Sequence, residues 1–275
     1  MDKRIVIIGL GEIGSANLED MLKIAKEKKL KYDFYGVDIN DIVLNNLKKK
    51  FPNVTYSKDI PKGDIYIILV YTNEQVESVI NNIQKDNNPL IIIESTIFPK
   101  TIERLRDLYD KDKNFSLALF PHRFNPDDKE HRVFNLHRII GGVNEESVER
   151  ALDLYKDFMS KELLTIVPFE IAALSKVVEN AYRFIEIAIA EEFKTECDRL
   201  NIDFNELRKS VNTKWNINLK EARDGIDRKC LPKDVNLLND FFKTNKIIRT
   251  AIEVNEEYKK KNQGGKNEEG KPASC

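Results

Sequence analysis

The sequence has 275 residues and a mass of 31.9 kDa, which is long for a single domain and suits two. Hydrophobic residues make up 41% of it and charged residues 33%, so there is enough apolar material to bury a sizeable core. The 45 basic and 46 acidic side chains nearly cancel, and this balance excludes a generally basic nucleic-acid-binding protein.

Apolar runs and cysteines narrow the class of protein further. No apolar run approaches the roughly 20 residues that a membrane helix needs. The start, MDKRIVIIGL, leads directly into a strand and does not resemble a secretory signal. The cysteines Cys197, Cys230 and Cys275 are odd in number and far apart, which argues against a disulfide framework. We therefore expect a protein of the reducing cytoplasm.

The first 168 residues alternate short β-branched runs with charged stretches of helical length. Runs such as IYIILV and LIIIES have no polar face, which is typical of strands covered on both sides in a parallel sheet. Two more apolar runs, 138–142 and 163–167, extend the predicted sheet around a helical stretch near 144–160. The pattern predicts a Rossmann-like, doubly wound α/β domain. Its first six strands are predicted at 5–10, 32–39, 54–57, 65–71, 90–95 and 115–120.

The pattern changes at Pro168. The following residues, to about 200, contain no Gly or Pro, carry apolar side chains at helical spacing, and begin where a proline often opens a helix. A helix of this length spans roughly 45 Å and commonly forms the spine of a second domain or a dimer interface. We predict a first domain at 1–168 and an all-α domain at 169–262, broken by a loop at about 216–230. The polar tail at 263–275 is predicted to be disordered.

The segment IVIIGLGEIG places G-x-G-x-x-G directly after a strand and before a helix. Gly9 allows the tight turn, Gly11 lets a pyrophosphate approach the backbone, and Gly14 lets the helix pack on the strand. The N–H groups and the positive dipole of the helix start favour a phosphate. Asp38, at the end of the second strand, would accept from the ribose hydroxyls and favours NAD. An ordinary βα turn with a chance acid is the alternative.

Polar side chains also follow the next strands, with Thr72 after IYIILVY and Ser95 and Thr96 after LIIIE. Ligands of open α/β sheets bind at such strand ends, although each residue taken singly is better explained as a helix cap. On the long helix, Lys176 and Asn180 are four residues apart and share a face. Polar groups on an apolar stretch need a partner or water. On spacing alone, a solvated stripe explains this pair better than a site.

Cys230 lies in RKCLPKD, where the proline and the run after it place the cysteine just ahead of a helix. The helix dipole, with Lys229 and Lys233 nearby, would favour the thiolate, which is how a nucleophilic cysteine is activated. An inert, packed thiol is the alternative, and the residues leave both interpretations open. Asp234, in the first turn, can simply complement the dipole. Cys197 shows no such surroundings and is predicted to be structural.

The sequence has three histidines, His122, His131 and His137. None of them has the i,i+4 partner or the nearby acid pattern of a metal site. We therefore expect no bound metal and predict that these histidines are solvated or cap helices.

Together these residues resemble the UDP-glucose/GDP-mannose dehydrogenase family, from residue 1 to about residue 260. Five motifs follow in the family's order: the glycine loop with Asp38, V-x-T at 70–72, E-S-T-x-x-P-x-T at 94–101, K-x-x-x-N at 176–180 and C-x-P-K-D at 230–234. Asn255, in IEVNEEY, fits the family's next helix. The resemblance implies an NAD-binding domain joined to a helical domain that forms a homodimer.

In that family, the primary alcohol of a nucleotide sugar is oxidised to a carboxylate while two NAD are reduced, a step of polysaccharide biosynthesis. By resemblance, Cys230 would attack the aldehyde to give a thiohemiacetal and then a thioester. Lys176 would stabilise the oxyanion and Asn180 would position the substrate. Asp234 with Thr96 would order the proton-transferring water. The same resemblance implies cofactor contacts at Gly9, Gly11, Glu12, Ile13, Gly14, Asp38, Thr72, Thr96 and Lys233, and substrate contacts at Lys176, Asn180 and Gly225.

Three features depart from the family pattern. The glycine-rich loop before the cysteine reads ARDGIDRKC, which keeps Gly225 but has Arg223, Asp227 and Arg228 where glycines are usual. The family's P-E-R is P-H-R here, so His122 replaces a glutamate tied to thioester hydrolysis. The family continues into a third, α/β domain that closes over the nucleotide, and this sequence ends at the connecting helix. We therefore expect a short member without the C-terminal UDP-binding domain.

The predicted activity is NAD-dependent oxidation of a UDP- or GDP-sugar through the cysteine intermediates. The first alternative is a two-domain β-hydroxyacid dehydrogenase-type enzyme, which matches the length better and uses a K-x-x-x-N pair without a cysteine. The C-x-P-K-D motif argues against it. The second alternative is a non-catalytic NAD-binding member, because loss of chemistry would produce the altered loop and the missing domain.

Overall fold

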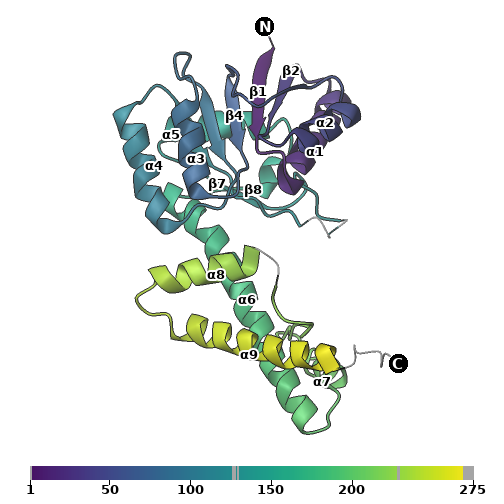
Figure 1. Ribbon diagram of the computed structural model, residues 1–275. Helices are drawn as coiled ribbons and strands as arrows, with labels where there is room; N and C mark the ends of the chain where they lie inside the picture. Colours follow the sequence, from purple (N-terminus) through teal and green to yellow (C-terminus); the bar gives the residue numbers. More distant parts are fainter. Residues whose placement is uncertain (1, 126–127, 129, 228–229, 269–275) are drawn as a thin grey trace, which may run out of the picture. The chain divides into compact units, whose positions relative to one another are not determined.

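The computed structural model describes residues 2–125, 128, 130–227 and 230–268, with side chains as far as residue 262 (Figure 1). The chain divides into two compact units, residues 1–176 and 177–275. The division falls inside the long helix α6 (Phe169–Arg199), whose first turns belong to the first unit.

An eight-stranded sheet forms the centre of the first unit, in the order β3-β2-β1-β4-β5-β6-β7-β8. All neighbours are parallel except β6 and β7, which are antiparallel. The strand order reverses between β1 and β4, where open α/β sheets bind ligands. This sheet confirms the predicted doubly wound fold and its extension by the two later apolar runs. The strands are β1 (Lys3–Ile8), β2 (Tyr32–Val37), β3 (Thr55–Ser57), β4 (Ile65–Ile68), β5 (Leu90–Ile93), β6 (Ser116–Leu119), β7 (Arg138–Gly142) and β8 (Leu164–Ile166).

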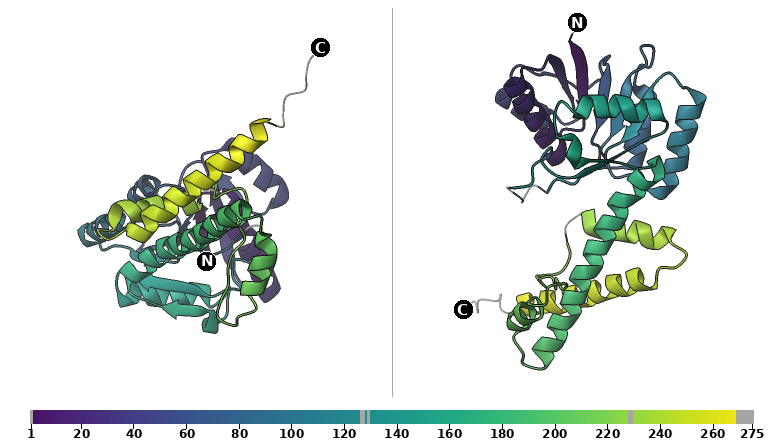
Figure 2. Two further views of the ribbon diagram at one scale, coloured as in Figure 1. Left: turned by 90° about the horizontal axis from the view of Figure 1, so that it is seen from below. Right: turned by 180° about the vertical axis from the view of Figure 1, so that it is seen from behind.

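Burial on both faces explains why the central strands are apolar throughout. In β1, Ile5 and Ile7 join the core on one face of the sheet, whereas Val6 and Ile8 join the core on the other. Helices α1, α2 and α5 contribute to the first core, and α3, α4 and the start of α6 contribute to the second (Figures 1 and 2). Successive residues of a strand therefore pack into opposite cores, because side chains along a strand point alternately to the two faces of the sheet.

Local sequence signals set the helix starts of the first unit. The side chains of Asn40, Thr72 and Asn144 each accept from a backbone N–H of the first turn, and Pro99 opens α4. The helices are α1 (Glu12–Lys28), α2 (Asp41–Lys50), α3 (Asn73–Asn82), α4 (Pro99–Lys111) and α5 (Glu145–Tyr155), followed by the 3₁₀ helix η1 (Lys161–Leu163).

The second unit is helical, as predicted. It contains the rest of α6 with α7 (Phe204–Val211), α8 (Cys230–Phe241) and α9 (Lys246–Glu268). Its main core joins Phe184 of α6 to Leu238 of α8 and Ala251 of α9. Asp203 caps α7 by accepting from two backbone N–H groups.

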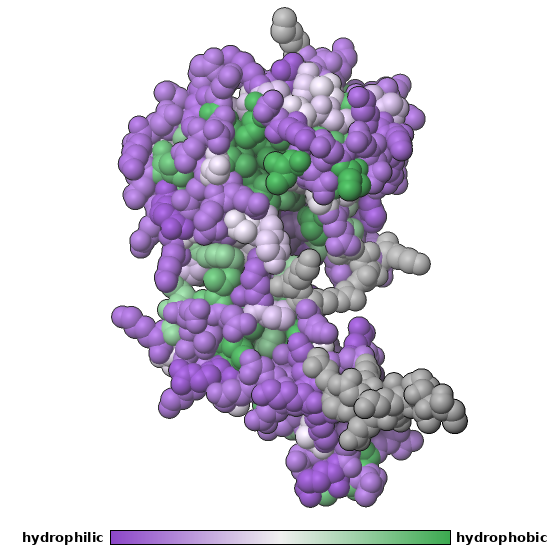
Figure 3. Space-filling view, viewed as in Figure 1, coloured by the Kyte–Doolittle hydropathy of each residue, from purple (hydrophilic) through white to green (hydrophobic). Residues whose placement is uncertain are grey.

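Helix α9 continues to Glu268, into the stretch at 263–275 that composition predicts to be disordered. Residues 269–275, including Cys275, lie outside the described residues. None of the described helices is long and apolar enough to cross a lipid bilayer. On the face seen in Figure 3, hydrophilic side chains predominate around smaller apolar patches.

Candidate functional site

The glycine loop (residues 9–14) places a different constraint on each of its glycines. Gly9 has a φ of +89°, and a Cβ there would overlap the carbonyl oxygen of Leu69. A Cβ on Gly14 would overlap the carbonyl oxygen of Gly9. A Cβ on Gly11 would meet no described atom within 4 Å. Packing within the protein therefore requires glycine at two positions, while the open space at Gly11 suits a ligand that approaches the backbone.

Asp38 lies beside this loop because two backbone groups hold its carboxylate. Leu10 N–H donates to Oδ2 at 2.7 Å and Asn40 N–H donates to Oδ1 at 2.9 Å. Each oxygen keeps a second acceptor site, which can receive a ribose hydroxyl. Helix α1 begins at Glu12 without a side-chain cap from any described residue, so N–H groups of its first turn, including that of Ile13, can receive a phosphate. These residues fit the ribose and pyrophosphate of NAD.

The ends of β4 and β5 are tied together by small polar side chains. Thr72 caps α3 in a capping box with Gln75, as the sequence predicts. Asn73 Nδ2 donates to the carbonyl oxygen of Thr96 at 3.0 Å, and Ser95 Oγ donates back toward the end of β4. The predicted contacts of Thr72 and Thr96 with a ligand stay predictions.

Directly after β5, the buried carboxylate of Glu94 is surrounded by four polar side chains. Asn17 Nδ2 and the Tyr155 hydroxyl donate to Oε1 at 3.0 and 2.8 Å. An Arg138 guanidinium nitrogen donates to Oε2 at 2.8 Å, and His122 Nδ1 lies 3.2 Å from the same oxygen. Burial alone would raise the pKa of Glu94, but Arg138 and His122 lower it to about 2. The carboxylate is therefore ionised at neutral pH.

Arg138, on β7, is completely buried and extends this network to the backbone. It also donates to the carbonyl oxygens of Phe120 and Pro121, and its guanidinium lies 3.8 Å from the centre of the Phe120 ring. No motif of the sequence predicts this network. Its one sequence signal is the arginine at the start of the apolar run RIIGG, because a charge in a buried strand needs a partner.

The prediction of a solvated or capping histidine is wrong for His122. Its side chain is buried against Glu94, whereas that of His131 is exposed. An ionised carboxylate can only accept, so Nδ1 carries the proton and Nε2 is the bare nitrogen of the neutral ring. Burial lowers the pKa of His122 to about 4, reinforced by Arg138 and Lys176 and opposed by Glu94. The ring is therefore neutral at physiological pH.

The second unit brings two of the predicted motifs into contact. Asn180 Nδ2 donates to Asp234 Oδ2 at 2.6 Å, and both side chains are buried. Lys233 Nζ lies 3.5 Å from the other Asp234 oxygen. The interpretation of Asn180 as part of a solvated stripe is therefore wrong, because its side chain is buried. Asp234 accepts a hydrogen bond from it, in addition to any interaction with the dipole of α8. Lys176, one turn earlier on α6, belongs to the first unit, where its charge influences His122.

Cys230 is an exposed, free thiol and the first residue of α8, so the helix begins one step earlier than predicted. Asp234 follows one turn later on the same face of the helix. Arg228 and Lys229, which the sequence places beside the thiol, lie outside the described residues. Cys197 is buried against Phe204, far along the chain from this motif.

Helix α9 holds the loop that leads to α8. Asn255 Oδ1 accepts from the N–H of Ile226 at 2.7 Å, and the Tyr258 hydroxyl donates to the Arg223 carbonyl at 2.7 Å. Between these anchors Gly225 has a φ of +96°, and a Cβ there would overlap a lysine side chain of α9. Glycine is therefore required at this position, and the loop takes its position from α9.

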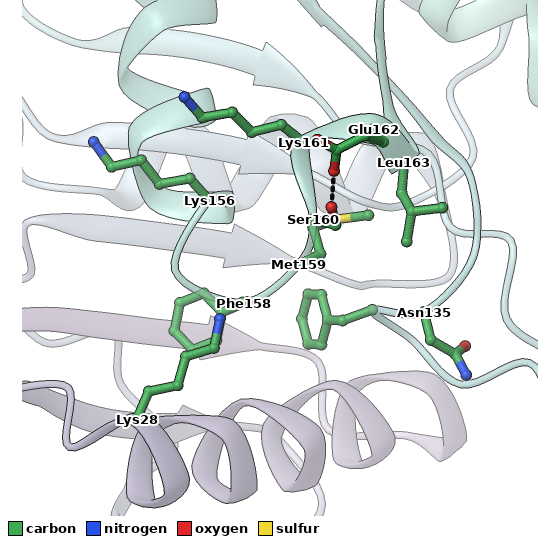
Figure 4. Close-up of a pocket in the computed structure, with 10 residues that line it drawn as sticks. Lys28, Asn135, Lys156, Phe158, Met159, Ser160, Lys161, Glu162 and Leu163 are labelled. Atoms are coloured by element: carbon green, nitrogen blue, oxygen red, sulfur yellow. Dashed lines mark hydrogen bonds between the residues drawn. The ribbon is translucent and has the colours of Figure 1, made fainter.

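A hollow of about 580 Å³ lies elsewhere on the first unit, between the end of α1 and the segment after α5 (Figure 4). Its lining combines Lys28, Lys156 and Lys161 with apolar side chains, and Ser160, which also lines it, donates to Glu162. None of the predicted site residues lines it. Among the described side chains, no group of three or more His, Cys, Asp or Glu is arranged to hold a metal ion.

Two family sequence models match this chain in order. Residues 3–159 match the UDP-glucose/GDP-mannose dehydrogenase family, NAD binding domain, and residues 170–257 match the central domain of the same family. The matches cover both units and bear out the predicted cofactor, NAD.

Curated and solved relatives agree with these matches. The UDP-N-acetyl-D-mannosamine dehydrogenase of Methanocaldococcus jannaschii is 30% identical over 92% of this chain and 65% of its own length. The solved UDP-D-ManNAc dehydrogenase of Pyrococcus horikoshii is 26% identical, covers 93% of this chain and 68% of its own, and has a TM-score of 0.79. The 3-hydroxyisobutyrate dehydrogenase of Mycobacterium tuberculosis covers 94% of both chains with a TM-score of 0.72, but at 13% identity it shows only the fold. This chain spans 65% of the length of the Methanocaldococcus jannaschii and Methanococcus vannielii relatives, slightly less than two thirds.

Proposed function

Because the chain belongs to the UDP-glucose/GDP-mannose dehydrogenase family, we propose that it oxidises the primary alcohol of a nucleotide sugar with NAD. The observation that carries the proposal is the contact of 2.6 Å between Asn180 and Asp234. It joins the K-x-x-x-N segment to the segment that contains Cys230, so that two sets of residues far apart in sequence form one buried polar group. Neither motif alone would justify the proposal.

The cofactor supplies the oxidising power, because NAD, when bound, accepts a hydride from the carbon being oxidised. The chain's own residues bind it: the N–H groups at the start of α1 hold the pyrophosphate and Asp38 accepts from a ribose hydroxyl. Thr72, Thr96 and Lys233 are proposed as further contacts.

Covalent catalysis by Cys230 follows the first oxidation. The thiolate adds to the aldehyde carbon and the aldehyde oxygen takes up a proton, which gives a thiohemiacetal. Loss of that hydroxyl proton to water and of the carbon-bound hydride to a second NAD would then give a thioester. Lys176 stabilises the oxyanion, since an ammonium group favours developing negative charge. Water then replaces the thiolate to release the carboxylate. Asp234, held by Asn180, orders that water with Thr96.

We take the substrate to be a UDP-N-acetylhexosamine, because the Methanocaldococcus and Pyrococcus relatives are named UDP-N-acetyl-D-mannosamine dehydrogenases. The test is NADH formation by the full chain with a panel of UDP- and GDP-sugars. Wild type and Cys197→Ala should form NADH, whereas Cys230→Ala should not complete the second oxidation. Equal NADH yields from wild type and Cys230→Ala would exclude the thioester route.

Cofactor binding has a sharper test in the glycine loop. Gly11→Ala adds a Cβ into open space, so we expect a stability cost of about 1 kcal/mol or less, with NAD affinity reduced more than about tenfold. Gly14→Ala should instead destabilise the unit, because its Cβ meets a carbonyl oxygen. Calorimetric NAD titration with thermal unfolding of both variants measures the two effects. Unchanged NAD affinity in Gly11→Ala would contradict this site.

A homodimer is proposed through α6. Val178, Tyr182, Ile189 and Phe193 are exposed on this helix with spacings of four, seven and four residues, which make one apolar stripe. Tyr182→Lys should shift the chain from dimer to monomer in analytical ultracentrifugation, and a wild-type monomer would contradict the proposal. The separated cysteines and the proposed role in polysaccharide biosynthesis favour a cytoplasmic location.

A β-hydroxyacid dehydrogenase-type reaction is the second candidate, favoured by the full-length match to the fold of the Mycobacterium protein. Such an enzyme would use Lys176 and Asn180 without Cys230. NADH formation from a small 3-hydroxy acid that survives alkylation of the thiol would select it.

A further inference from the structure

The Nε2 atom of His122 is a buried hydrogen-bonding group that none of the described residues satisfies. Leaving a buried acceptor unpaired costs about 1–3 kcal/mol, and native structures rarely do so without a reason. The ring cannot turn over to relieve this, because its Nδ1–H is held by the Glu94 carboxylate. The bare nitrogen is therefore fixed in place and needs a donor that none of the described residues supplies.

Its place in the fold indicates what that donor is. His122 follows β6, and β4, β5 and β6 are parallel neighbours whose carboxyl ends carry Thr72, Thr96 and His122. Ligands of such sheets bind at this edge. Lys176, of the same unit, is near enough that its charge lowers the pKa of His122. The imidazole acceptor of His122 and the ammonium group of Lys176 thus lie in the same part of the first unit.

We propose that His122 is the base that takes the proton from the primary hydroxyl of the sugar during the first oxidation. This inference rests on the proposed function and deepens it. The arrangement is that of a histidine general base, in which a carboxylate binds one ring nitrogen so that the other nitrogen can accept a proton. Here Glu94 is the orienting carboxylate, and His122 is proposed to touch the reacting hydroxyl.

The step moves one proton and one hydride away from the alcohol. The hydroxyl O–H bond breaks and its proton moves to Nε2. The C–H bond breaks with its electron pair, which leaves as the hydride that NAD takes up, and the C=O bond of the aldehyde forms. Lys176 favours the negative charge that develops on the oxygen. The imidazolium formed on His122 lies against Glu94 and returns its proton to water after the step.

The charged groups around the His122 ring explain why its Nε2 is ready to accept a proton. Glu94 faces it from the end of β5, Arg138 from β7 and Lys176 from α6. Burial and the two positive charges keep the ring uncharged, and the single negative charge gives the imidazolium a partner once it forms.

The decisive variant is His122→Asn. The amide nitrogen of asparagine can donate to Glu94 in place of Nδ1–H, but the side chain offers no base. With the UDP-sugar that wild type oxidises, kcat for the first NADH should fall by about 10²–10⁴-fold with little change in KM. The residual rate should rise with pH, because hydroxide must replace the lost base. His137→Gln, which changes an exposed histidine of the same unit, should keep wild-type kinetics.

A second measurement does not need turnover. In wild type labelled with ¹⁵N-histidine, Nε2 of His122 should resonate as an unprotonated nitrogen at neutral pH, and its signal should move when the UDP-sugar is added. A protonated Nε2 would overturn the proposal even if His122→Asn failed to fold.

The outcomes separate this inference from the function on which it rests. An active wild type with equally active His122→Asn overturns the role of His122 alone and leaves it a structural partner of Glu94. A folded wild type that oxidises no nucleotide sugar overturns the proposed function and this step together. An active wild type with a slow, pH-dependent His122→Asn supports both.

Discussion

Glu94 in the first unit and Glu191 in the second are both almost fully buried, at 1% and 0% exposure, yet their surroundings are opposite. Glu94 has polar partners at both oxygens, and two of them, Arg138 and His122, lower its pKa to about 2. Neither oxygen of Glu191 has a hydrogen-bond partner in the part of the chain that is described. Burial raises the pKa of Glu191 to about 7, although the charge of Lys259 acts against this. Burial pushes both carboxyls the same way, and the partners decide the outcome.

The difference in partners gives these two buried glutamates different roles. The Glu94 network links α1, β5, β7 and α5 and orients His122, so the carboxylate works as a permanently charged anchor. Glu191 instead gains or loses a proton near neutral pH on the long helix, close enough to Lys259 of α9 for the two charges to interact.

Arg138→Met should have the largest effect, because it leaves Glu94 charged and buried without its cation. We expect a loss of about 3–5 kcal/mol in the free energy of unfolding, measured by urea denaturation. Lys50→Met, which breaks the exposed pair with Glu19, should cost less than about 1 kcal/mol. Equal costs for the two variants would mean that the buried network is no anchor.

Tyr155→Phe should have an intermediate effect. It removes one donor to Glu94 while Asn17 still donates to the same oxygen, and a hydrogen bond to a charged group is worth about 1.5–3 kcal/mol. Tyr109→Phe is the matched control, since its hydroxyl accepts from the exposed Asn144 side chain. Thermal unfolding of both variants should rank Tyr155→Phe as clearly less stable. The reverse order would contradict the network.

Glu191→Gln should have the smallest effect, and its sign should depend on pH. The folded pKa of about 7 lies above the usual glutamate value of 4.5, so between these pH values the folded protein binds more protons than the unfolded chain. The stability of wild type relative to Glu191→Gln therefore falls as pH rises through this window. Above pH 7 the variant should be the more stable, by on the order of 1 kcal/mol.

The measurement for Glu191 is urea denaturation of both proteins at several pH values. His122 has a lowered pKa and acts the other way, because it costs wild type stability as pH falls. That contribution is common to both proteins and cancels in their difference. A difference that does not change with pH would mean that Glu191 does not titrate in the folded state.

Much of the fold could be predicted from sequence because its signals are local. The unbroken apolar run of β4 reports burial on two faces, and Pro168 marks the start of α6. The glycine loop could be located for the same reason, because a strand, a tight turn and a helix follow one another directly along the chain. Such features depend on neighbours a few residues away.

The parts that could not be predicted depend on distant contacts. Glu94 and Arg138 meet only because β5, β6 and β7 lie side by side, with β7 antiparallel. His122 was misjudged for this reason: its partner comes from another strand, and nothing near it in sequence shows that it is buried. The contact between Asn180 and Asp234 is of the same kind, which spacing along either helix cannot reveal.

The alternation of β1 between two cores has a consequence for insertions and deletions. One residue added or removed within the strand would exchange the partners of every later position, so that Ile7 and Ile8 would each face the layer built for the other. Gly9 would move with them, away from the carbonyl of Leu69 that its bare Cα fits against. The length of this strand is thus as strictly determined as its composition, whereas surface connections of the same unit can vary in length at little cost.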